Sequence, residues 1–464
     1  MNKLIPTTMI ALGALVFSAP QALAQGTSTT VPGANGYDLS PDGGIVAGVD
    51  ATGSFIWNPV TGFTYLQGGI GNVQKVSANG FVVAGQIDDV ALGNKAAGYW
   101  SLTTDMWTSM GQHPSMNGGC PTFGTAYAIS DDGGTLGGLL WDGCFTDAFM
   151  WNAATGYTLM TDANDSARLN DMSGDGTMGG GWIQTTSRVA AMWDTAGNLT
   201  QPLISPANPG GFGEIFGVDM DGSSFTGWQN GGAFLMRNGV FTDINAALGA
   251  PQSVGSSISN DGRVVGGWSG TGGPFGVQSG MVYTDWMGGF DATAFFAMFG
   301  VTPPVGQTSY SEVRAVSGDA NSFLAIAGGF PFTESVLITL PDSFSSLGGG
   351  TVGVAGTPAL DGYGWLNPGM TAGIELLDAA PASIAVLAFG GTYTPTPLFG
   401  GIVGPLPADG FLFFPTGAAG EVDFTFTWPL TMPSGLNLYT QYGVLDPSVA
   451  GGIALSNTLQ LTGN

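Results

Sequence analysis

The sequence predicts an all-β protein with two parts, a β-propeller of about seven blades and an immunoglobulin-like β-sandwich after it. Three observations carry this prediction. A short phrase recurs about seven times between residues 36 and 340, at intervals of about 40 to 55 residues. Six of the copies place a second glycine five positions after the glycine of a turn of the type Ser-x-Asp/Asn-Gly. After residue 340 the repeat stops, and short stretches that alternate between polar and apolar residues follow.

The first 24 residues predict a signal peptide. Lys3 supplies a positive start, residues 4–17 are mostly apolar, and an Ala-x-Ala site ends at Ala24, so cleavage is expected between Ala24 and Gln25. No later stretch has the roughly 18 consecutive apolar residues that a membrane span needs. We therefore expect an exported protein without a membrane span, secreted to the exterior or kept in the periplasm or at the cell surface.

The repeat predicts a strand, a tight turn and a second strand in each copy. Six copies carry the glycine pairs Gly43/Gly48, Gly80/Gly85, Gly133/Gly138, Gly176/Gly181, Gly222/Gly227 and Gly262/Gly267. A seventh, degraded copy has Ala320 and Ala325 in these two slots. The first glycine suits the positive φ of a tight turn, and the second is expected where neighbouring backbones approach closely.

Two more strands follow the second glycine in each copy. The third strand ends in an aromatic residue in several copies, as at Trp57 and Trp100, and the fourth follows a turn that contains glycine. Four strands per unit and about seven units are typical of a β-propeller, here expected over residues 25–341. Residues 27–31 are expected to pair with the last blade and close the ring, and residues 291–299 to form a short helix.

The repeat unit resembles the HAF repeat of bacterial exported proteins. The best-matching segments are Ala128-Ile129-Ser130 with Ala148-Phe149-Met150-Trp151, and Ala233-Phe234-Leu235. The pattern covers about two thirds of the chain, and the histidine that gives the repeat its name is replaced by Asp147 or Gly232. The resemblance implies a secreted, propeller-like protein and brings no established active site with it.

The C-terminal part predicts a separate module. Residues 342–358 are rich in Gly, Ser and Thr, which is typical of a linker. Residues 359–464 contain short alternating stretches, of which 422–428 is the clearest. Turns every 8 to 12 residues favour an immunoglobulin-like sandwich of the kind appended to many secreted bacterial proteins.

The charge of the chain limits its partners. It carries 33 acidic and 8 basic residues, for a net charge of −25. Such a surface repels phosphate backbones, so nucleic acid is excluded as a partner. We expect a monomer whose partners are surface glycans or components of the extracellular matrix.

Cys120 and Cys144 are the only cysteines. In an exported protein an even pair favours one disulfide, which would hold residues 114–123 against the blade beside them. A metal site is the weaker alternative, because His113 is the only histidine and brings the soft ligands to three. No metal or other cofactor is expected.

The tryptophans invite a carbohydrate-binding hypothesis, but most of them recur in register with the repeat. Seven share two repeat slots, which predicts packing within and between blades: Trp57, Trp100, Trp151, Trp193, Trp182, Trp228 and Trp268. Trp107, Trp141 and Trp286 fit the slots less well, so they are the better candidates for exposed contacts.

The Asp-containing turns also resemble half of a calcium loop. Asp38-x-Ser40-x-Asp42 and Asp171-x-Ser173-x-Asp175 have the spacing, but Val49 and Trp182 stand where the distal glutamate belongs. In other copies Lys75 or Ala128 replaces the first ligand. We therefore interpret these segments as hairpin turns.

Catalytic chemistry has little support in the sequence. His113 is the only histidine, and no Gly-x-Ser-x-Gly elbow is present. Arginines could surround a sialidase-like channel, but their repeat positions differ, which predicts that they do not converge: Arg168, Arg188, Arg237, Arg263 and Arg314. The primary hypothesis is a non-catalytic protein that acts by binding or by surface or matrix association. The alternative is a polysaccharide-active glycosidase or lyase at the channel mouth, which would need carboxylates, Arg and Tyr to converge there.

Overall fold

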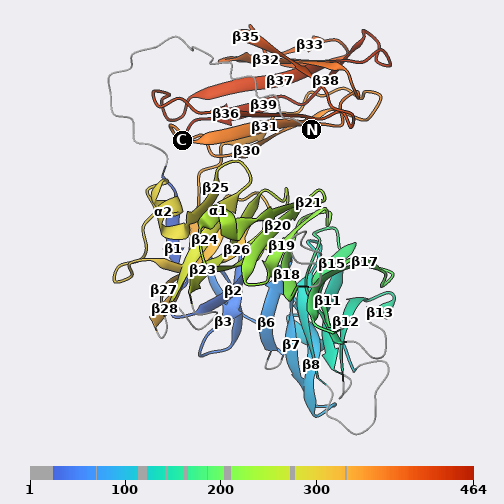
Figure 1. Ribbon diagram of the computed structural model, residues 1–464, viewed down its shortest axis with the longest axis vertical. Helices are drawn as coiled ribbons and strands as arrows, with labels where there is room; N and C mark the ends of the chain where they lie inside the picture. The colour runs from blue at the N-terminus through green and yellow to red at the C-terminus, as the bar shows by residue number, and fades with distance from the viewer. Residues whose placement is uncertain are drawn as a thin grey trace. The chain divides into compact units, whose positions relative to one another are not determined.

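The computed structural model describes residues 25–68, 71–112, 123–141, 145–160, 166–184, 186–202, 211–271, 277–329 and 332–464. The chain divides into two compact units, a propeller from Gly26 to Leu340 and a second unit that contains Pro341–Asn464 (Figure 1). Apart from two short helices, every regular element described is a β-strand. The predicted all-β class is confirmed.

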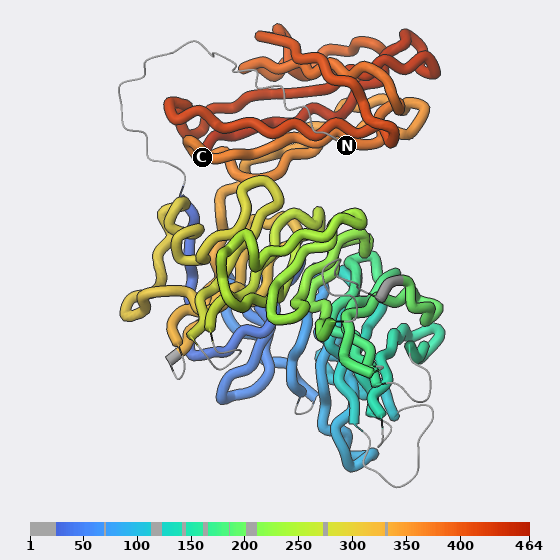
Figure 2. The backbone as a smooth tube through the Cα atoms, in the orientation of Figure 1, coloured from blue at the N-terminus to red at the C-terminus, as the bar shows by residue number. Residues whose placement is uncertain are grey.

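The propeller consists of seven antiparallel sheets of four strands, and Figure 2 shows their hairpins following one another along the chain. Blades 1 to 3 contain β2 (Asn35–Leu39), β3 (Val46–Val49), β4 (Ser54–Asn58), β5 (Gly62–Tyr65); β6 (Gly71–Val76), β7 (Val82–Asp89), β8 (Asn94–Ser101), β9 (Met106–Ser109); β10 (Phe123–Ile129), β11 (Thr135–Trp141), β12 (Thr146–Asn152) and β13 (Gly156–Leu159). Blades 4 and 5 contain β14 (Ser166–Met172), β15 (Met178–Gln184), β16 (Arg188–Asp194), β17 (Leu199–Pro202); β18 (Gly213–Val218), β19 (Ser224–Gln229), β20 (Gly232–Arg237) and β21 (Val240–Asp243). Blades 6 and 7 contain β22 (Gln252–Ile258), β23 (Val264–Thr271), β24 (Val277–Thr284), β25 (Gly288–Asp291); β26 (Tyr310–Val316), β27 (Ser322–Gly329), β28 (Phe332–Thr339) and β1 (Thr27–Thr30).

The ring closes because the last blade takes its fourth strand from the start of the propeller. β1 pairs antiparallel with β28, with Thr27 opposite Thr339 and Thr30 opposite Val336. The closure expected from residues 27–31 is therefore confirmed. The inner strand of each blade contacts the inner strands of its neighbours, from β2 against β6 round to β26 against β2.

Two short helices follow outer strands. α1 (Ile244–Leu248) is capped by Asp243, and α2 (Ala292–Ala297) is capped by Asp291, whose carboxylate accepts two backbone N–H groups. α2 confirms the helix expected within residues 291–299. In the part of the chain that the structure describes, no helix is long and apolar enough to cross a membrane.

The Ser-x-Asp-Gly turn joins the inner strand of each blade to the second strand, with Asn79 replacing Asp in blade 2, Asp219 replacing Ser in blade 5 and Ala320 replacing Gly in blade 7. In blade 1 the Ser40 hydroxyl donates to Asp42 and accepts from the N–H of Ile45, while the N–H of Gly43 donates to the carbonyl of Ser40. Gly43 has a φ of +75°. The serine is fully buried, so its hydroxyl satisfies backbone groups that water cannot reach. This pattern explains why serine, an acidic residue or Asn, and glycine recur together.

The second glycine faces a β-bulge in the inner strand. In blade 6 the register shifts between Gly255 and Ser257, and a Cβ added to Gly267 would overlap the carbonyl oxygen of Val254. A Cβ added to the corresponding glycine in each of the five preceding blades would overlap a carbonyl oxygen of the inner strand in the same way. Blade 7 has Ala325 in this slot, and its inner pair carries two register shifts instead of one.

The alanine in the turn of blade 7 leads to a stability prediction. Ala320 has a φ of +59° where six blades have glycine, and a left-handed conformation costs a residue with a Cβ roughly 1–2 kcal/mol. We expect Ala320→Gly to raise the free energy of unfolding by about 0.5–1 kcal/mol in urea titration, because glycine's larger chain entropy offsets part of that gain. Ala78→Gly is the control, since Ala78 lies in a turn without positive φ and should lose stability.

The second unit has two main sheets and a two-stranded ribbon. The larger sheet has the order β29-β39-β37-β32-β35, with β38 beside β37, the second has the order β30-β31-β36, and β33 pairs with β34. Its strands are β29 (Phe344–Ser346), β30 (Ala359–Gly364), β31 (Thr371–Leu377), β32 (Ile384–Gly390), β33 (Tyr393–Leu398), β34 (Gly401–Pro405), β35 (Gly410–Pro415), β36 (Val422–Thr427), β37 (Asn437–Leu445), β38 (Ile453–Leu455) and β39 (Leu459–Thr462).

One hydrophobic core joins the two main sheets, which makes the unit a sandwich. It includes Leu360 and Ile374 from the smaller sheet and Leu387, Tyr442 and Leu461 from the larger one. Strand β36 alternates as the sequence predicts, since Val422 is buried and Asp423 exposed.

Residues 342–358, expected to be a linker, are instead part of the sandwich. Residues 342–358 contain β29, and the backbone N–H groups of Leu347 and Thr351 donate to the carbonyls of Thr458 and Leu455. The segment therefore belongs to the sandwich, and the boundary between the units lies at Leu340 and Pro341. Small, polar residues favour an exposed linker in sequence, but backbone pairing with the sandwich orders them here.

Several sequence predictions lie outside the described residues. These are the disulfide of Cys120 and Cys144, the position of His113, and the signal peptide up to Ala24. Gln25 is described and exposed, which does not test cleavage before it.

Candidate binding site in the propeller channel

The bulge in each inner strand places three residues per blade toward the central channel. A bulge puts two successive residues on the same side of a strand, and the residue two positions before them shares that side. In blade 1 these are Asn35, Tyr37 and Asp38, while Gly36 and Leu39 are buried in the blade. The register shifts in the other six blades give the same arrangement.

Three rings of residues therefore follow the seven inner strands around the channel axis. The outer ring, nearest the hairpins between second and third strands, contains Asn35, Asn72, Thr125, Arg168, Glu214, Val254 and Glu312. The middle ring contains Tyr37, Gln74, Tyr127, Asn170, Phe216, Ser256 and Arg314. The inner ring, next to the Ser-x-Asp-Gly turns, contains Asp38, Lys75, Ala128, Asp171, Gly217, Ser257 and Ala315. Members of all three rings line one cavity of about 340 Å³, which we call the mouth of the channel.

The basic residues of the chain gather at this channel. Lys75, Arg168 and Arg314 line the mouth, and Arg188 shares the carboxylate of Glu214 with Arg168. Four of the eight Lys and Arg residues thus meet in one place. The prediction that the arginines do not converge is wrong for these three.

Glu214 holds two guanidinium groups at the junction of blades 4 and 5. Its Oε2 lies 3.1 Å from Nη2 of Arg168, and its Oε1 pairs with Nη1 of Arg188. The side chain of Glu214 is 4% exposed, so water screens these pairs only weakly. Arg188 also stacks over Trp182, with 4.1 Å between the guanidinium carbon and the ring centroid.

Arg168 and Arg314 are each held by further partners. Arg168 donates from Nε to Asn170 at 2.5 Å and lies 5.1 Å from the ring centroid of Tyr127. Arg314 donates to Glu312 at 2.9 Å and, at the junction between the last and first blades, to the carbonyl of Gly36 at 2.6 Å. The mouth therefore presents ordered charged groups rather than mobile ones.

Lys75 spans the inner ring. Its ammonium lies 3.5 Å from Asp38 of blade 1 and 3.3 Å from Asp171 of blade 4. Burial raises the pKa of both carboxyls, and Lys75 opposes that shift. Burial alone would lower the pKa of Lys75, but the two carboxylates raise it above its usual range. We call Lys75, Asp38 and Asp171 the strut.

The two aspartates of the strut also accept backbone hydrogen bonds from the next blade. Asp38 accepts the backbone N–H of Val76 at 2.9 Å, and Asp171 accepts that of Val218 at 3.0 Å. Both belong to the calcium-like motifs, and both point to the next blade rather than to their own turns. No cluster of three or more His, Cys, Asp or Glu suited to a metal ion occurs among the described residues.

Aromatic side chains supply the rest of the mouth. Tyr37, Tyr127, Phe216 and Trp268 line it and are all half-buried. Trp268 was expected in the core, so its place at the mouth was missed. The slot after the second glycine faces the outer ring, because Trp268 lies opposite Val254 in the ladder.

Other tryptophan predictions have mixed outcomes. Trp57, Trp100, Trp182 and Trp193 are buried, as expected. Trp107, proposed as an exposed contact, is only 4% exposed, because its ring packs against Gly71, which has no side chain to exclude it.

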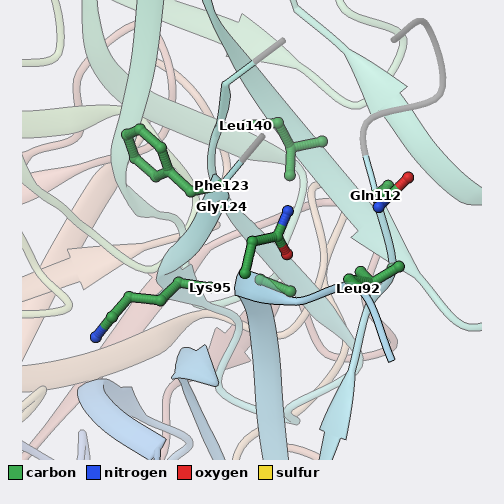
Figure 3. Close-up of a pocket in the computed structure, with 9 residues that line it drawn as sticks. Leu92, Lys95, Gln112, Phe123, Gly124 and Leu140 are labelled. Carbon is green, nitrogen blue, oxygen red and sulfur yellow. The ribbon is translucent and has the colours of Figure 1, made fainter. Parts of the chain in front are cut away.

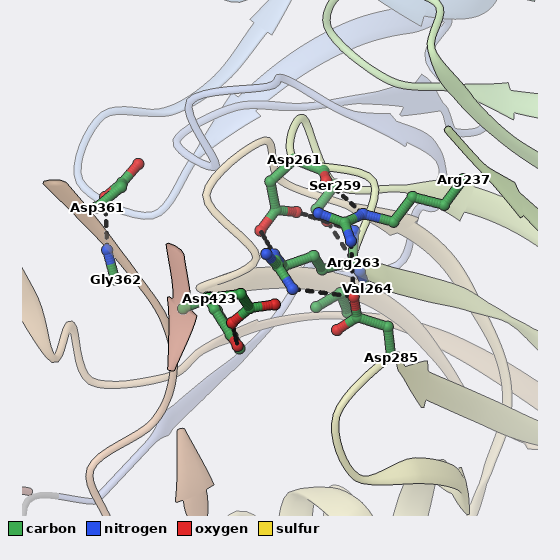
Figure 4. A network of polar contacts seen from close by, with 10 residues as sticks. Arg237, Ser259, Asp261, Arg263, Val264, Asp285, Asp361, Gly362 and Asp423 are labelled. Atoms are coloured by element: carbon green, nitrogen blue, oxygen red, sulfur yellow. Dashed lines mark hydrogen bonds and ion pairs between the residues drawn. The ribbon is translucent and has the colours of Figure 1, made fainter. Parts of the chain in front are cut away.

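The other basic side chains that the structure describes lie elsewhere. Arg237 and Arg263 share Asp285 at 3.2 and 3.0 Å, and Arg263 is 2% exposed, which suits a structural ion pair beside the turn of blade 6 (Figure 4). Lys95 pairs with Asp88 at 3.6 Å on the surface. It borders a second cavity, between Phe123 and Leu140, of only about 10 Å³, and its ammonium points away from them (Figure 3). That space is no larger than one water molecule.

Comparison with known proteins finds structural matches at low sequence identity. No protein-family model and no curated protein matches the sequence. An oligogalacturonate lyase in complex with manganese matches with 12% identity and a TM-score of 0.43, over 69% of this chain and 95% of that chain. The propeller domain of the Trilobed protease from Pyrococcus furiosus matches with 9% identity and a TM-score of 0.41, over 67% and 95%.

TolB from Acinetobacter baumannii is a further structural match. It has 14% identity and a TM-score of 0.30, over 49% of this chain and 52% of that chain, so the match spans about half of TolB.

Proposed function

We propose that this protein is a non-catalytic binding protein that takes a neutral, polyhydroxylated ligand, a sugar unit of a glycan, at the channel mouth. The observation that carries the proposal is the composition of that mouth. Aromatic rings and hydrogen-bonding side chains surround a cavity of about 340 Å³, within the size range of small-molecule sites. The apolar faces of sugar rings stack on aromatic rings, and sugar hydroxyls both donate and accept hydrogen bonds.

Charge supports a neutral ligand. Three cations line the mouth, Lys75, Arg168 and Arg314, and Arg188 joins them through Glu214. Four carboxylates contact these four cations, those of Asp38, Asp171, Glu214 and Glu312, so the charges of the linked groups cancel. The chain as a whole carries a net charge of −25. A charge-balanced channel in so acidic a protein selects neither anions nor cations strongly.

The same pairing supports binding without turnover. Carboxylates and Arg do converge at the mouth, which meets the geometric condition set for the enzymatic alternative. However, each channel carboxylate is held by an arginine or by Lys75, and a general acid or base needs a carboxyl group that can exchange a proton with the substrate. We therefore retain the polysaccharide-active enzyme as the outcome that contradicts the proposal.

The sequence supports the wider biological setting that we propose. The signal-peptide pattern of residues 1–24 favours export, and the resemblance of the repeats to the HAF family favours a role outside the cell. Surface glycans or matrix components are the proposed partners of a monomer, and the acidic surface disfavours nucleic acid.

Phe216→Ala tests the proposed site. Phe216 is a half-buried member of the middle ring, so removing its ring takes away stacking area at the centre of the mouth. We expect the dissociation constant for the best binder on a neutral-glycan array to rise at least tenfold, or about 1.4 kcal/mol. Calorimetric titration of the full chain measures it.

The matched control is Phe81→Ala. Phe81 is 52% exposed beside the turn of blade 2, at the other end of the propeller, and its removal should leave binding unchanged. Equal losses in both variants would exclude the mouth as the site. Release of chromogenic aglycones from a glycoside panel, abolished by Glu312→Gln, would show that the protein is an enzyme.

A further inference from the structure

The seven turns of the Ser-x-Asp-Gly type lie around the end of the channel that is opposite the mouth. Backbone hydrogen bonds link the second residue of one turn to its neighbour: Gly318 to Pro41 at 2.7 Å, Asn260 to Gly318 at 2.9 Å, and Asp131 to Gly174 at 2.9 Å. Met220 donates to Asn260, and Ala78 donates to Asp131. At the junction of blades 4 and 5, the third turn residue, Asp175, donates to Met220 at 3.0 Å. Six of the seven junctions are therefore linked, and the seventh lacks such a bond because Pro41 has no N–H.

Side chains from neighbouring turns also pack against one another. Gly174 and Gly318 leave room that Asp131 and Asn260 occupy, since a Cβ on Gly318 would meet the Asn260 amide at 2.5 Å. Asn260 in turn lies 3.7 Å from the sulfur of Met220. We call this hydrogen-bonded ring of turns the floor.

The strut lies between this floor and the mouth. Asp38 and Lys75 line both the mouth and the space below it, and Asp171 lines the lower space. The lower space measures about 50 Å³, which suits a few water molecules and no sugar unit.

We infer that the mouth is a blind site that recognises the ends of glycan chains and does not bind their internal segments. This inference rests on the proposed function. A ligand that reaches Phe216 and Gln74 in the middle ring has to leave by the way it entered, because the strut crosses the channel and the space below it, about 50 Å³, is too small for a sugar unit. A sugar unit inside a glycan is bonded to further units on both sides, so both of these stretches would have to leave through the opening of one cavity of about 340 Å³. A terminal unit has only one such stretch.

The test compares polymers at equal mass and different numbers of ends. Dextran, mannan, galactan and xylan are each titrated by calorimetry into the full chain, intact and after partial hydrolysis that raises the chain ends tenfold. For each polysaccharide that binds, we expect the mass concentration at half saturation to fall about tenfold after hydrolysis.

The outcomes separate this inference from the proposed function. Equal half-saturating masses before and after hydrolysis would mean that internal segments bind, which overturns chain-end recognition and leaves glycan binding intact. Absence of binding by all eight samples would overturn glycan binding, and chain-end recognition with it. Phe216→Ala should raise the half-saturating mass of the intact and the hydrolysed sample at least tenfold, whereas Phe81→Ala should leave both unchanged.

Discussion

Replacing Lys75 by methionine is expected to lower the free energy of unfolding of the propeller by about 3–5 kcal/mol at pH 7. The substitution keeps an unbranched side chain as far as Cε and removes the cation between two buried carboxylates. Their side chains are 6% and 12% exposed, so little water replaces the ammonium. Removal of one partner from a buried ion network costs in this range because uncompensated charge stays behind. Urea unfolding followed by circular dichroism measures the loss.

Lys95→Met is the matched control for Lys75→Met. Lys95 pairs with Asp88, but the two side chains are 62% and 46% exposed, so the expected change is below about 0.5 kcal/mol. The triple variant Lys75→Met with Asp38→Asn and Asp171→Asn should recover most of the loss. Asn keeps a carbonyl oxygen for the N–H of Val76 or Val218 and carries no charge. A triple variant as unstable as Lys75→Met would contradict the electrostatic explanation.

The pH dependence gives this prediction a second signature. Burial already raises the pKa of Asp38 and Asp171 in the folded protein, and the loss of Lys75 raises it further. The folded variant then binds more protons than the unfolded chain, so its stability increases as the pH falls toward the ordinary carboxyl range. The difference from the native protein should therefore shrink between pH 7 and pH 4. A difference that is constant over this range would show that packing rather than charge is lost.

The blades could be predicted from the sequence because their determinants are local. The buried serine, the acceptor two residues later and the left-handed glycine act within one turn, and the second glycine responds to the bulge directly opposite it. Such contacts leave a fixed spacing in the sequence. By contrast, residues 342–358 are ordered by partners such as Thr458, about a hundred positions away, so their composition could not show it.

The site was harder to predict because its members come from different repeat positions and meet only in space. Arg168 belongs to the outer ring and Arg314 to the middle ring, yet both line the same mouth, since seven inner strands surround one axis and arginine side chains are long. The strut had a visible signal. Asp38, Lys75 and Asp171 occupy one repeat position, but Lys75 was interpreted as a failed calcium ligand rather than as the partner of the two aspartates.

The second large effect is expected for Gly267→Ala, which should lower the free energy of unfolding by about 2–3 kcal/mol or prevent folding. The new methyl group would overlap the carbonyl oxygen of Val254, a backbone atom that cannot rotate away. The overlap can be removed only if the bulge of β22 moves. Because Val254 also lines the mouth, the variant should weaken glycan binding as well.

Gly329→Ala is the control for Gly267→Ala, because a Cβ there meets no atom within 4 Å and its φ is not positive. Its effect should stay within about 0.5 kcal/mol. Blade 7 already has an alanine, Ala325, in the slot that Gly267 occupies in blade 6. It accommodates this alanine in a ladder with a second register shift, between Tyr310 and Glu312. Blade 6 has a single shift, so it lacks that freedom. If Gly267→Ala unfolds at the same urea concentration as Gly329→Ala, close approach at the bulge is not what selects glycine in this slot.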